Sequence, residues 1–363
     1  MIIFKPTEKG PNILIAGAGP TGLTAAVELS RRGIIPKIID RKEAPSPLSR
    51  AVGIMPASLN TLKPSGVTEH LVEEGIKMKY AQIFRGDKLL LRIALEGGHP
   101  DWDYAIALPQ DRTEHALIEA LKRFGGSIDF GNELTGIRQE ENQVIVNINN
   151  GPDEKYDFVL GADGIHSAVR NGLGIDYPGY DLPEKWSIAD FDAVNWPYHE
   201  SGTICVLPHG DMAFVVALEE NRYRVVSNTE DALDALPLKL EVTNKHREGK
   251  FNISIRQVKE YRKGRVFLAG DAAHCHSPAG GRGMNLGIAD AAEWSRRIVD
   301  NDLEGYSLSR HEAGAATIAL SERLRKTMSS KSPVTKSILT VFAAAVNIFP
   351  PLRHRMAKTF LDG

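Results

Sequence analysis

The stretch Ile13-Leu14-Ile15-Ala16-Gly17-Ala18-Gly19-Pro20-Thr21-Gly22 decides the fold of this chain. Its first four residues form an apolar run that predicts a buried strand, and residues 23–29 have the spacing of a helix with one buried face. Gly17 allows a tight turn, Gly19 lets the backbone approach a pyrophosphate, and Gly22 lets helix and strand pack closely. Free N–H groups at the start of the helix would therefore face phosphates.

A second predicted strand, Lys37-Ile38-Ile39-Asp40, ends in a carboxylate. Asp40 lies roughly 20 residues past the glycine turn, where dinucleotide sites place an acceptor for ribose hydroxyls. We assign Asp40 and the adjacent Arg41 to the same cofactor, and we expect Gly33 to end the preceding helix. The alternative is a glycine turn that only connects a strand to a helix. The turn alone does not separate NAD from FAD.

A second motif, far away in the sequence, favours FAD over NAD as the cofactor. Residues 265–269 read Arg-Val-Phe-Leu-Ala, a buried-strand pattern that delivers Gly270 and Asp271 to its carboxyl end, where open α/β sheets bind ligands. A carboxylate there can accept hydrogen bonds from the sugar-alcohol chain of a flavin. The following stretch, Pro278-Ala279-Gly280-Gly281-Arg282-Gly283-Met284-Asn285, then starts a helix whose N-terminus stabilises negative charge on a reduced flavin. The alternative is a glycine-rich loop that lets chain segments pass closely.

These motifs together resemble a known family. The chain combines Gly-Ala-Gly-Pro-Thr-Gly at 17–22, Gly-Ala-Asp-Gly-Ile-His-Ser-Ala-Val-Arg at 161–170, Ala-Gly-Asp-Ala-Ala-His at 269–274 and Gly-Arg-Gly-Met-Asn at 281–285. This combination is similar to the single-component flavoprotein aromatic hydroxylases, the group of para-hydroxybenzoate hydroxylase and phenol hydroxylase. The resemblance covers most of the chain from Gly10 to about Arg297.

The resemblance implies further cofactor contacts. It places Asp163 and Gly164 under the pyrophosphate, in a segment braced by Arg170, and Arg50 beside the phosphates. A fixed cation near two phosphates also compensates their charge, whereas the alternative for Arg50 is a solvated surface residue. Gln110 matches a position beside the ribityl chain or isoalloxazine; the alternative is an ordinary polar residue at a helix start. The predicted cofactor contacts are Gly17, Ala18, Gly19, Pro20, Thr21, Gly22, Asp40, Arg41, Arg50, Gln110, Leu134, whose backbone matches an adenine contact, Asp163, Gly164, Gly270, Asp271, Pro278, Gly281, Gly283, Met284 and Asn285.

The chain also departs from the family pattern. Asp40 stands where many members carry Glu, which shortens the reach but keeps the acceptor. Arg282 stands where a neutral residue such as Gln is common, so it either tunes the flavin or extends into solvent. The chain stops at residue 363, and we expect it to lack the thioredoxin-like C-terminal domain of some members.

We predict an α/β fold: a Rossmann-like FAD-binding domain with an inserted, mainly antiparallel sheet and a C-terminal helical region. Short alternating strands are predicted at 186–191, 203–207, 212–217 and 223–227. The predicted FAD-binding domain comprises residues 1–82, 111–180 and 263–300, the substrate domain 83–110 and 181–262, and the helical region 301–363. The inserted sheet would cover an apolar substrate pocket, with Phe214, Val216, Tyr223 and Val225 as candidate wall residues.

The resemblance implies an NAD(P)H-dependent FAD monooxygenase that uses O2 and hydroxylates an aromatic or polycyclic compound through a flavin C4a-hydroperoxide. Pro278 and its loop would shape the oxygen-reactive flavin face, and His209, His274 and His276 are candidates for a base that activates a phenol. Two alternatives stay open: a flavin oxidoreductase or halogenase of the same fold, and a non-catalytic flavin-holding protein.

The composition of the chain bears on which partners and cellular compartment to expect. The 44 basic and 46 acidic residues nearly balance, which gives no electrostatic case for nucleic acid. Cys205 and Cys275 lack a CxxC spacing, so we expect neither a metal site nor a dithiol. We also expect a reducing, cytoplasmic compartment.

The apolar run 338–349 is too short to span a bilayer. We expect it to form a helix that covers the core; the alternative is that it lies on an anionic membrane surface. A monomer or a homodimer is expected.

Overall fold

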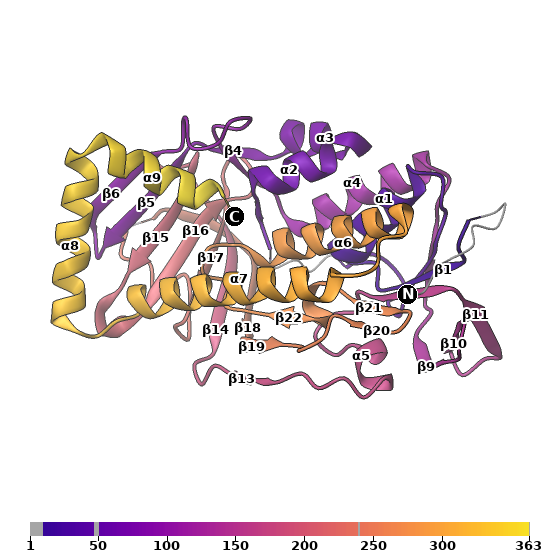
Figure 1. The fold of residues 1–363 in the computed structure, drawn as a ribbon. Coiled ribbons are helices and arrows are strands. Elements are labelled where there is room, and N and C mark those ends of the chain that lie inside the picture. The colour runs from indigo at the N-terminus through magenta and orange to yellow at the C-terminus, as the bar shows by residue number, and fades with distance from the viewer. Residues whose placement is uncertain (1–9, 47–50, 239, 363) are drawn as a thin grey trace.

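The computed structural model describes residues 10–46, 51–238 and 240–362. A mostly parallel sheet lies at one end of the molecule and an antiparallel sheet at the other, and the long helix α7 (Tyr306–Met328) extends from the first towards the second (Figure 1). The last two helices, α8 (Pro333–Ile348) and α9 (Pro350–Leu361), lie at the far end, against the antiparallel sheet.

The glycine turn lies on the central strand of the six-stranded sheet, whose order is β20-β21-β12-β1-β2-β8. Strand β1 pairs in parallel with β2 and β12, and β12 pairs in parallel with β21. The carboxyl ends of β1, β12 and β21 therefore meet at one edge, where ligands of such sheets bind. The strands are β1 (Ile13–Ala16), β2 (Lys37–Asp40), β8 (Ile128–Phe130), β12 (Phe158–Gly161), β20 (Arg262–Lys263) and β21 (Val266–Leu268).

Two helices that begin at this edge pack on each other. Helix α1 (Pro20–Ser30) contacts α6 (Gly283–Asp300) extensively and also α4 (Gln110–Arg123). Helix α1 starts with Pro at its first turn, which tolerates the missing N–H, and its buried face runs from Gly22 to Ser30. The predicted strand–turn–helix at 13–30 is therefore present. Shorter helices complete this region: α2 (Pro56–Leu62), α3 (Val67–Glu74) and α5 (Ala168–Gly172).

The inserted sheet has seven strands in the order β18-β14-β17-β16-β15-β5-β6, all antiparallel except the β15–β5 pair. The four strands predicted from alternation are all found in it. The strands are β5 (Tyr80–Arg85), β6 (Lys88–Ala94), β14 (Trp186–Ala193), β15 (Ser201–Val206), β16 (Met212–Ala217), β17 (Arg222–Ser227) and β18 (Val242–Phe251). There are also three small sheets of three strands each. They consist of β3 (Gly53–Ile54), β7 (Ala105–Ala107) and β4 (Ile76–Met78); β9 (Leu134–Gln139), β10 (Val144–Ile148) and β11 (Asp153–Tyr156); and β13 (Gly179–Asp181), β19 (Ser254–Gln257) and β22 (His274–Cys275).

The four candidate wall residues do not share one face of this sheet. Tyr223 pairs directly with Ala217, and Val225 with Val215, so Tyr223 and Val225 lie on the face opposite to Phe214 and Val216. Tyr223 and Val225 pack into a cluster that includes Phe191 and Trp196. The other pair belongs to a cluster that includes Val52 and Met55, from the segment that follows residue 50. The grouping of all four residues in one wall is wrong; only Phe214 and Val216 face the cofactor-binding part.

The apolar run near the C-terminus forms helix α8, which packs on β6. Ala343 and Val346 are buried in that contact, as expected for a helix that covers the core. The opposite face of α8 stays exposed. Among the described residues no single helix has the length and apolarity of a bilayer span, although α8 and α9 together pass that criterion with a 109° bend between them.

Gly22→Ala should destabilise the fold. A Cβ at Gly22 would lie 1.9 Å from the carbonyl oxygen of Gly17, a backbone atom that cannot rotate away. We expect the free energy of unfolding of the flavin-free protein to fall by about 1–3 kcal/mol. Urea denaturation measures it, with Gly249→Ala as the matched control, because a Cβ there meets only Ile188 at 3.7 Å. Equal stability of the two variants would contradict this packing.

Candidate active site

The three glycine-containing motifs meet at one place. A Cβ at Gly17 would lie 2.3 Å from the carbonyl oxygen of Ala162 and 2.9 Å from Cα of Asp163, so the first turn touches the middle motif. A Cβ at Gly270 would lie 2.6 Å from Oγ1 of Thr21, so the late motif touches the start of α1. Segments up to 250 residues apart in sequence thus form one continuous edge, and a single long ligand can contact all three.

The first turn leaves space where a cofactor is expected. Gly19 has nothing within 4 Å of a Cβ built on it, and its φ of −79° is ordinary. The need for glycine at this position is therefore not explained by the protein's own packing. Asp40 lies beside the turn: its carboxylate accepts hydrogen bonds from the N–H groups of Ala18 (2.8 Å) and Lys42 (2.9 Å). Each carboxylate oxygen has two lone pairs, so it can still accept from ribose hydroxyls.

Asn285 joins the start of α6 to the segment that precedes α2. Its side-chain oxygen accepts from the N–H of Met55 and from the hydroxyl of Ser58, both at 2.8 Å. Its amide nitrogen donates to the carbonyls of Gly53 (2.9 Å) and Gly281 (3.0 Å). The loop from Pro278 to Gly281, closed by an N–H···O bond of 2.9 Å between its ends, is thus held next to residues 53–55. Pro278 and Gly281 are themselves exposed.

Asp163 and Arg170 hold the middle motif rigid. The Asp163 carboxylate accepts from the N–H groups of Ala168 (2.7 Å) and Val169 (3.2 Å), which fixes it at the start of α5. Burial raises the pKa of Asp163, while these hydrogen bonds act in the opposite direction. The Arg170 guanidinium donates to the carbonyls of Ala272 (3.0 Å) and Ile165 (2.9 Å). Arg170 therefore contacts the middle motif, which it was expected to brace, and also links it to the late motif.

The remaining predicted contacts lie around this edge. Gln110 is the first residue of α4; its N–H donates to the carbonyl of Ala51 (3.1 Å) and its side chain donates to Glu114 (2.8 Å). Leu134 begins β9 with its side chain buried, and Arg41 is 3.9 Å from Glu133 with both side chains exposed. Arg50 lies outside the described residues.

Arg282 does not extend into solvent. It precedes the first turn of α6, is only 7% exposed, and donates a 3.0 Å hydrogen bond to the carbonyl of Thr359 in α9. Burial lowers the pKa of its guanidinium. The solvated alternative is therefore wrong: the cation is buried at the N-terminus of α6, because the C-terminal helix folds back over it and supplies an acceptor 77 residues away in sequence.

A buried carboxylate that sequence reasoning missed supports the late motif. Asp290, in α6, is fully buried and accepts from the N–H of Gly270 (3.0 Å), from Nε2 of His274 (2.6 Å) and from Nε of Arg310 (2.6 Å). Burial alone would raise the pKa of Asp290, but His274 and Arg310 hold it below its usual range. Asp290 repeats the spacing of Gly283, Gly287 and Trp294, so an acid within the buried stripe of α6 was the available signal.

The three candidate histidines have different surroundings. His274 is committed to Asp290. Burial lowers the pKa of His276 to about 4, and its Nδ1 lies 2.8 Å from the carbonyl of Ser277, so it is a poor base at neutral pH. His209 is exposed in the β15–β16 turn, and the adjacent Gly210 lies against Ser329 and Lys331 rather than against α6. None of the three is placed as the expected base.

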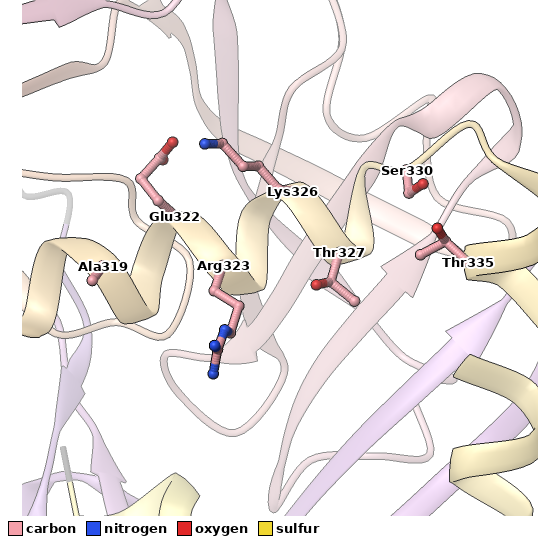
Figure 2. Close-up of a pocket in the computed structure, with 7 residues that line it drawn as sticks. All are labelled: Ala319, Glu322, Arg323, Lys326, Thr327, Ser330 and Thr335. Atoms are coloured by element: carbon pink, nitrogen blue, oxygen red, sulfur yellow. The ribbon is translucent and has the colours of Figure 1, made fainter. Parts of the chain in front are cut away.

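Two cavities were found near the C-terminal helices. One of 560 Å³ lies at the turn between α7 and α8; Figure 2 shows its mostly polar lining, with Glu322 and Lys326 on one side of α7 and Arg323 on the other. It contains none of the predicted site residues. The second, of 310 Å³, lies between α2, α6 and α7 and borders Met55, Asn285, Arg282 and Arg310. It adjoins the predicted cofactor site from the side of α2. Among the described residues no group of three His, Cys, Asp or Glu residues is arranged to hold a metal ion.

The sequence of the first 300 residues matches one family. The model of the FAD binding domain family matches residues 11–300. The chain belongs to the FAD-binding domain family. It is 28% identical to 6-methylpretetramide 4-monooxygenase of Streptomyces rimosus, over 99% of this chain and 69% of that protein. It is 33% identical to an uncharacterized aromatic compound monooxygenase of Bacillus subtilis, over 86% of this chain and 68% of that protein.

Solved structures of monooxygenases have a similar fold. The p-nitrophenol 4-monooxygenase of Pseudomonas putida superposes with a TM-score of 0.89 at 20% identity and covers 98% of this chain and 99% of its own. The anhydrotetracycline hydroxylase of Streptomyces rimosus superposes with a TM-score of 0.78 at 25% identity, over 97% of this chain and 76% of its own. The predicted α/β fold with an inserted sheet, FAD as the cofactor, and FAD-dependent aromatic monooxygenation as the class of reaction are confirmed.

Asp290→Asn should weaken both the fold and the late motif. The amide keeps the shape but leaves Arg310 buried without a carboxylate, a loss of about 3–5 kcal/mol. Because the folded pKa of Asp290 lies below the unfolded value, the ionised carboxylate stabilises the wild type above about pH 4, and this contribution falls as pH drops through the folded pKa. Urea denaturation from neutral to acidic pH measures the difference.

Two outcomes would contradict this role. The gap in stability between wild type and Asp290→Asn should shrink as the pH falls, so a constant gap would mean that the charge is not what Asp290 contributes. The variant should also bind FAD more weakly when folded, because the N–H of Gly270 then faces a neutral amide group instead of a carboxylate, which is the stronger acceptor. Wild-type affinity would show that Asp290 supports the core alone.

Proposed function

We propose that the chain is an NAD(P)H- and O2-dependent FAD monooxygenase that hydroxylates an aromatic ring, with FAD lying along the edge formed by the three motifs. The observation that carries the proposal is their contact: the Gly17 turn touches Asp163, and Gly270 touches Thr21. The family model and the monooxygenases among the relatives support the same assignment.

The residues at this edge suit the parts of FAD in order. The free space at Gly19 and the N-terminus of α1 suit the pyrophosphate, and Asp40 and Arg41 suit the adenosine ribose. Asp271, exposed at the end of β21, suits the ribityl hydroxyls. The segment at 53–55 and the Pro278–Gly281 loop, held together by Asn285, suit the isoalloxazine. Gln110, Leu134, Gly164 and Met284 complete the proposed contacts.

FAD held at this edge would supply the redox chemistry, namely hydride acceptance from a nicotinamide and transfer of one oxygen atom of O2 to the substrate. The protein's part is electrostatics and orientation. The start of α6, an 18-residue helix, presents a positive dipole end, and the buried Arg282 adds a full positive charge there. Both stabilise negative charge that develops beside them. The exposed Pro278 loop limits the access of other molecules to the proposed flavin position from that side.

The substrate pocket is proposed on the sheet face that carries Phe214 and Val216. Directly beside them, paired across the strands, lie Val226 and Arg224, and Arg224 forms a buried two-point ion pair with Asp190 at 2.7 Å. Apolar side chains with one committed charged pair suit a flat, mostly apolar ring system. The similar proteins include a 6-methylpretetramide 4-monooxygenase, an anhydrotetracycline hydroxylase and a p-nitrophenol 4-monooxygenase, so polycyclic compounds and simple phenols are the first compounds to test.

Gly19→Val should abolish tight FAD binding while the protein stays folded. The new side chain meets no protein atom but occupies the space assigned to the pyrophosphate. We expect a loss of at least about a hundredfold in FAD affinity, since the phosphates lose their approach to the helix start. Reconstitution of the apoprotein, followed by flavin fluorescence, measures this; circular dichroism checks the fold. Asp271→Ala should reduce affinity less. Wild-type affinity of Gly19→Val would place the pyrophosphate elsewhere.

Substrate-stimulated turnover tests the reaction. The FAD-loaded protein, given NADH or NADPH with phenols, aromatic acids or polyketide-like polycycles, should consume nicotinamide and O2 together and release a hydroxylated product. The same mixture without O2 is the control. Product formed anaerobically would favour a flavin oxidoreductase, and no turnover with any donor by a fully FAD-loaded protein would favour the flavin-holding alternative.

A further inference from the structure

Helix α8 carries an apolar stripe that the protein does not cover. Six large apolar side chains stand out with exposed fractions of 37–70%: Val334, Ile338, Val341, Phe342, Ile348 and Phe349. The first five are spaced by four, three, one and six residues, which puts them on one side of α8; Phe349 directly follows the last residue of the helix. The opposite side packs on β6 through Ala343 and Val346. The stripe is therefore additional to the contact that holds α8 in place.

The stripe lies in a segment of one charge sign. Residues 323–361 contain eight Lys or Arg and no Asp or Glu. The whole chain has a net charge of −2, so the remaining residues carry −10. Within the parts of the chain that the structure describes, only Arg325 of these eight cations is ion-paired with an acid. The free cations are Arg323, Lys326, Lys331, Lys336, Arg353, Arg355 and Lys358.

We propose that this end of the molecule, the α8 stripe together with the basic segment 323–361 that contains it, binds the surface of an anionic lipid membrane. Apolar side chains enter the acyl boundary, and Lys and Arg contact the headgroups, which is how interfacial helices bind. The helix lies on the surface rather than across it, because its other face is already packed on β6. Figure 1 shows α8 at the extreme end of the molecule, opposite the parallel sheet that holds the motifs.

Charge decides between a membrane and a second copy of the chain. Two copies that met through this face would bring seven uncompensated positive charges of one copy near seven of the other, which opposes association. An anionic lipid surface supplies the opposite sign and also accepts the apolar stripe. Nucleic acid would match the charge alone and would leave the six apolar side chains without a partner.

The test uses the full FAD-loaded chain and vesicles of phosphatidylcholine, with or without about 30% phosphatidylserine. We expect the protein to float with the anionic vesicles and at least about ten times less with the neutral ones. About 1 M salt should weaken the binding, because it screens the cations. The variant Ile338→Glu/Val341→Glu should bind at least about tenfold less. Leu308→Glu, at a 66% exposed apolar position of α7, is the matched control and should bind like wild type.

FAD content and NAD(P)H consumption should be the same in all these proteins, because α8 contributes nothing to the proposed cofactor edge. Wild-type protein that stays unbound at every lipid composition would overturn the proposal, as would equal binding of the double variant and wild type. A lipid-free dimer that the double variant dissociates would show that a second copy covers the stripe, and would overturn it as well.

Discussion

The structure depends on backbone segments that approach each other more closely than any side chain allows. At Gly17, Gly22 and Gly270 a Cβ would lie within 1.9–2.6 Å of a neighbouring atom. Parallel pairing puts the ends of β1, β12 and β21 at a common edge, and these approaches then bring the three motifs into contact there, with Thr21 of α1 against Gly270 of the late motif. Without them the three motifs would lie on the same sheet but would be separated by side chains. A cofactor that extends from one motif to the next needs this continuity.

Gly19 obeys a different constraint. Its neighbours leave it room for a side chain, so folding does not require glycine there. The proposed pyrophosphate supplies the missing reason. The distinction matters because a glycine that serves packing and a glycine that serves a ligand look alike in the sequence. The structure distinguishes them by the atoms that a Cβ would contact. Substitution of Gly22 therefore tests the packing, and substitution of Gly19 tests the ligand.

Local patterns in the sequence were sufficient for three strands of the parallel sheet, four strands of the inserted sheet, the glycine turn, the start of α6 and the family. Other strands, among them β18 (Val242–Phe251), were not predicted. Long-range partners were not predictable. Asp290 finds Arg310 on the next helix, and Arg282 finds the Thr359 carbonyl on the last one. Alternation within one strand predicts which of its residues share a face. The register between β16 and β17 is a long-range property, and it places Tyr223 and Val225 on the other face of the sheet from Phe214 and Val216. The division into domains and the individual cofactor contacts stay predictions.

Charged side chains at the proposed site also connect the helices around it. Asp290 holds the N–H of Gly270 and, through Arg310, joins α6 to α7. At the start of α6, Arg282 is anchored by α9, which follows α8 in sequence. The proposed flavin edge is thus held by α7 and α9, the helices that precede and follow α8 in sequence. If the exposed stripe of α8 rests on a lipid surface, the same helices orient the enzyme so that an apolar aromatic substrate dissolved in the membrane is close to the protein that hydroxylates it.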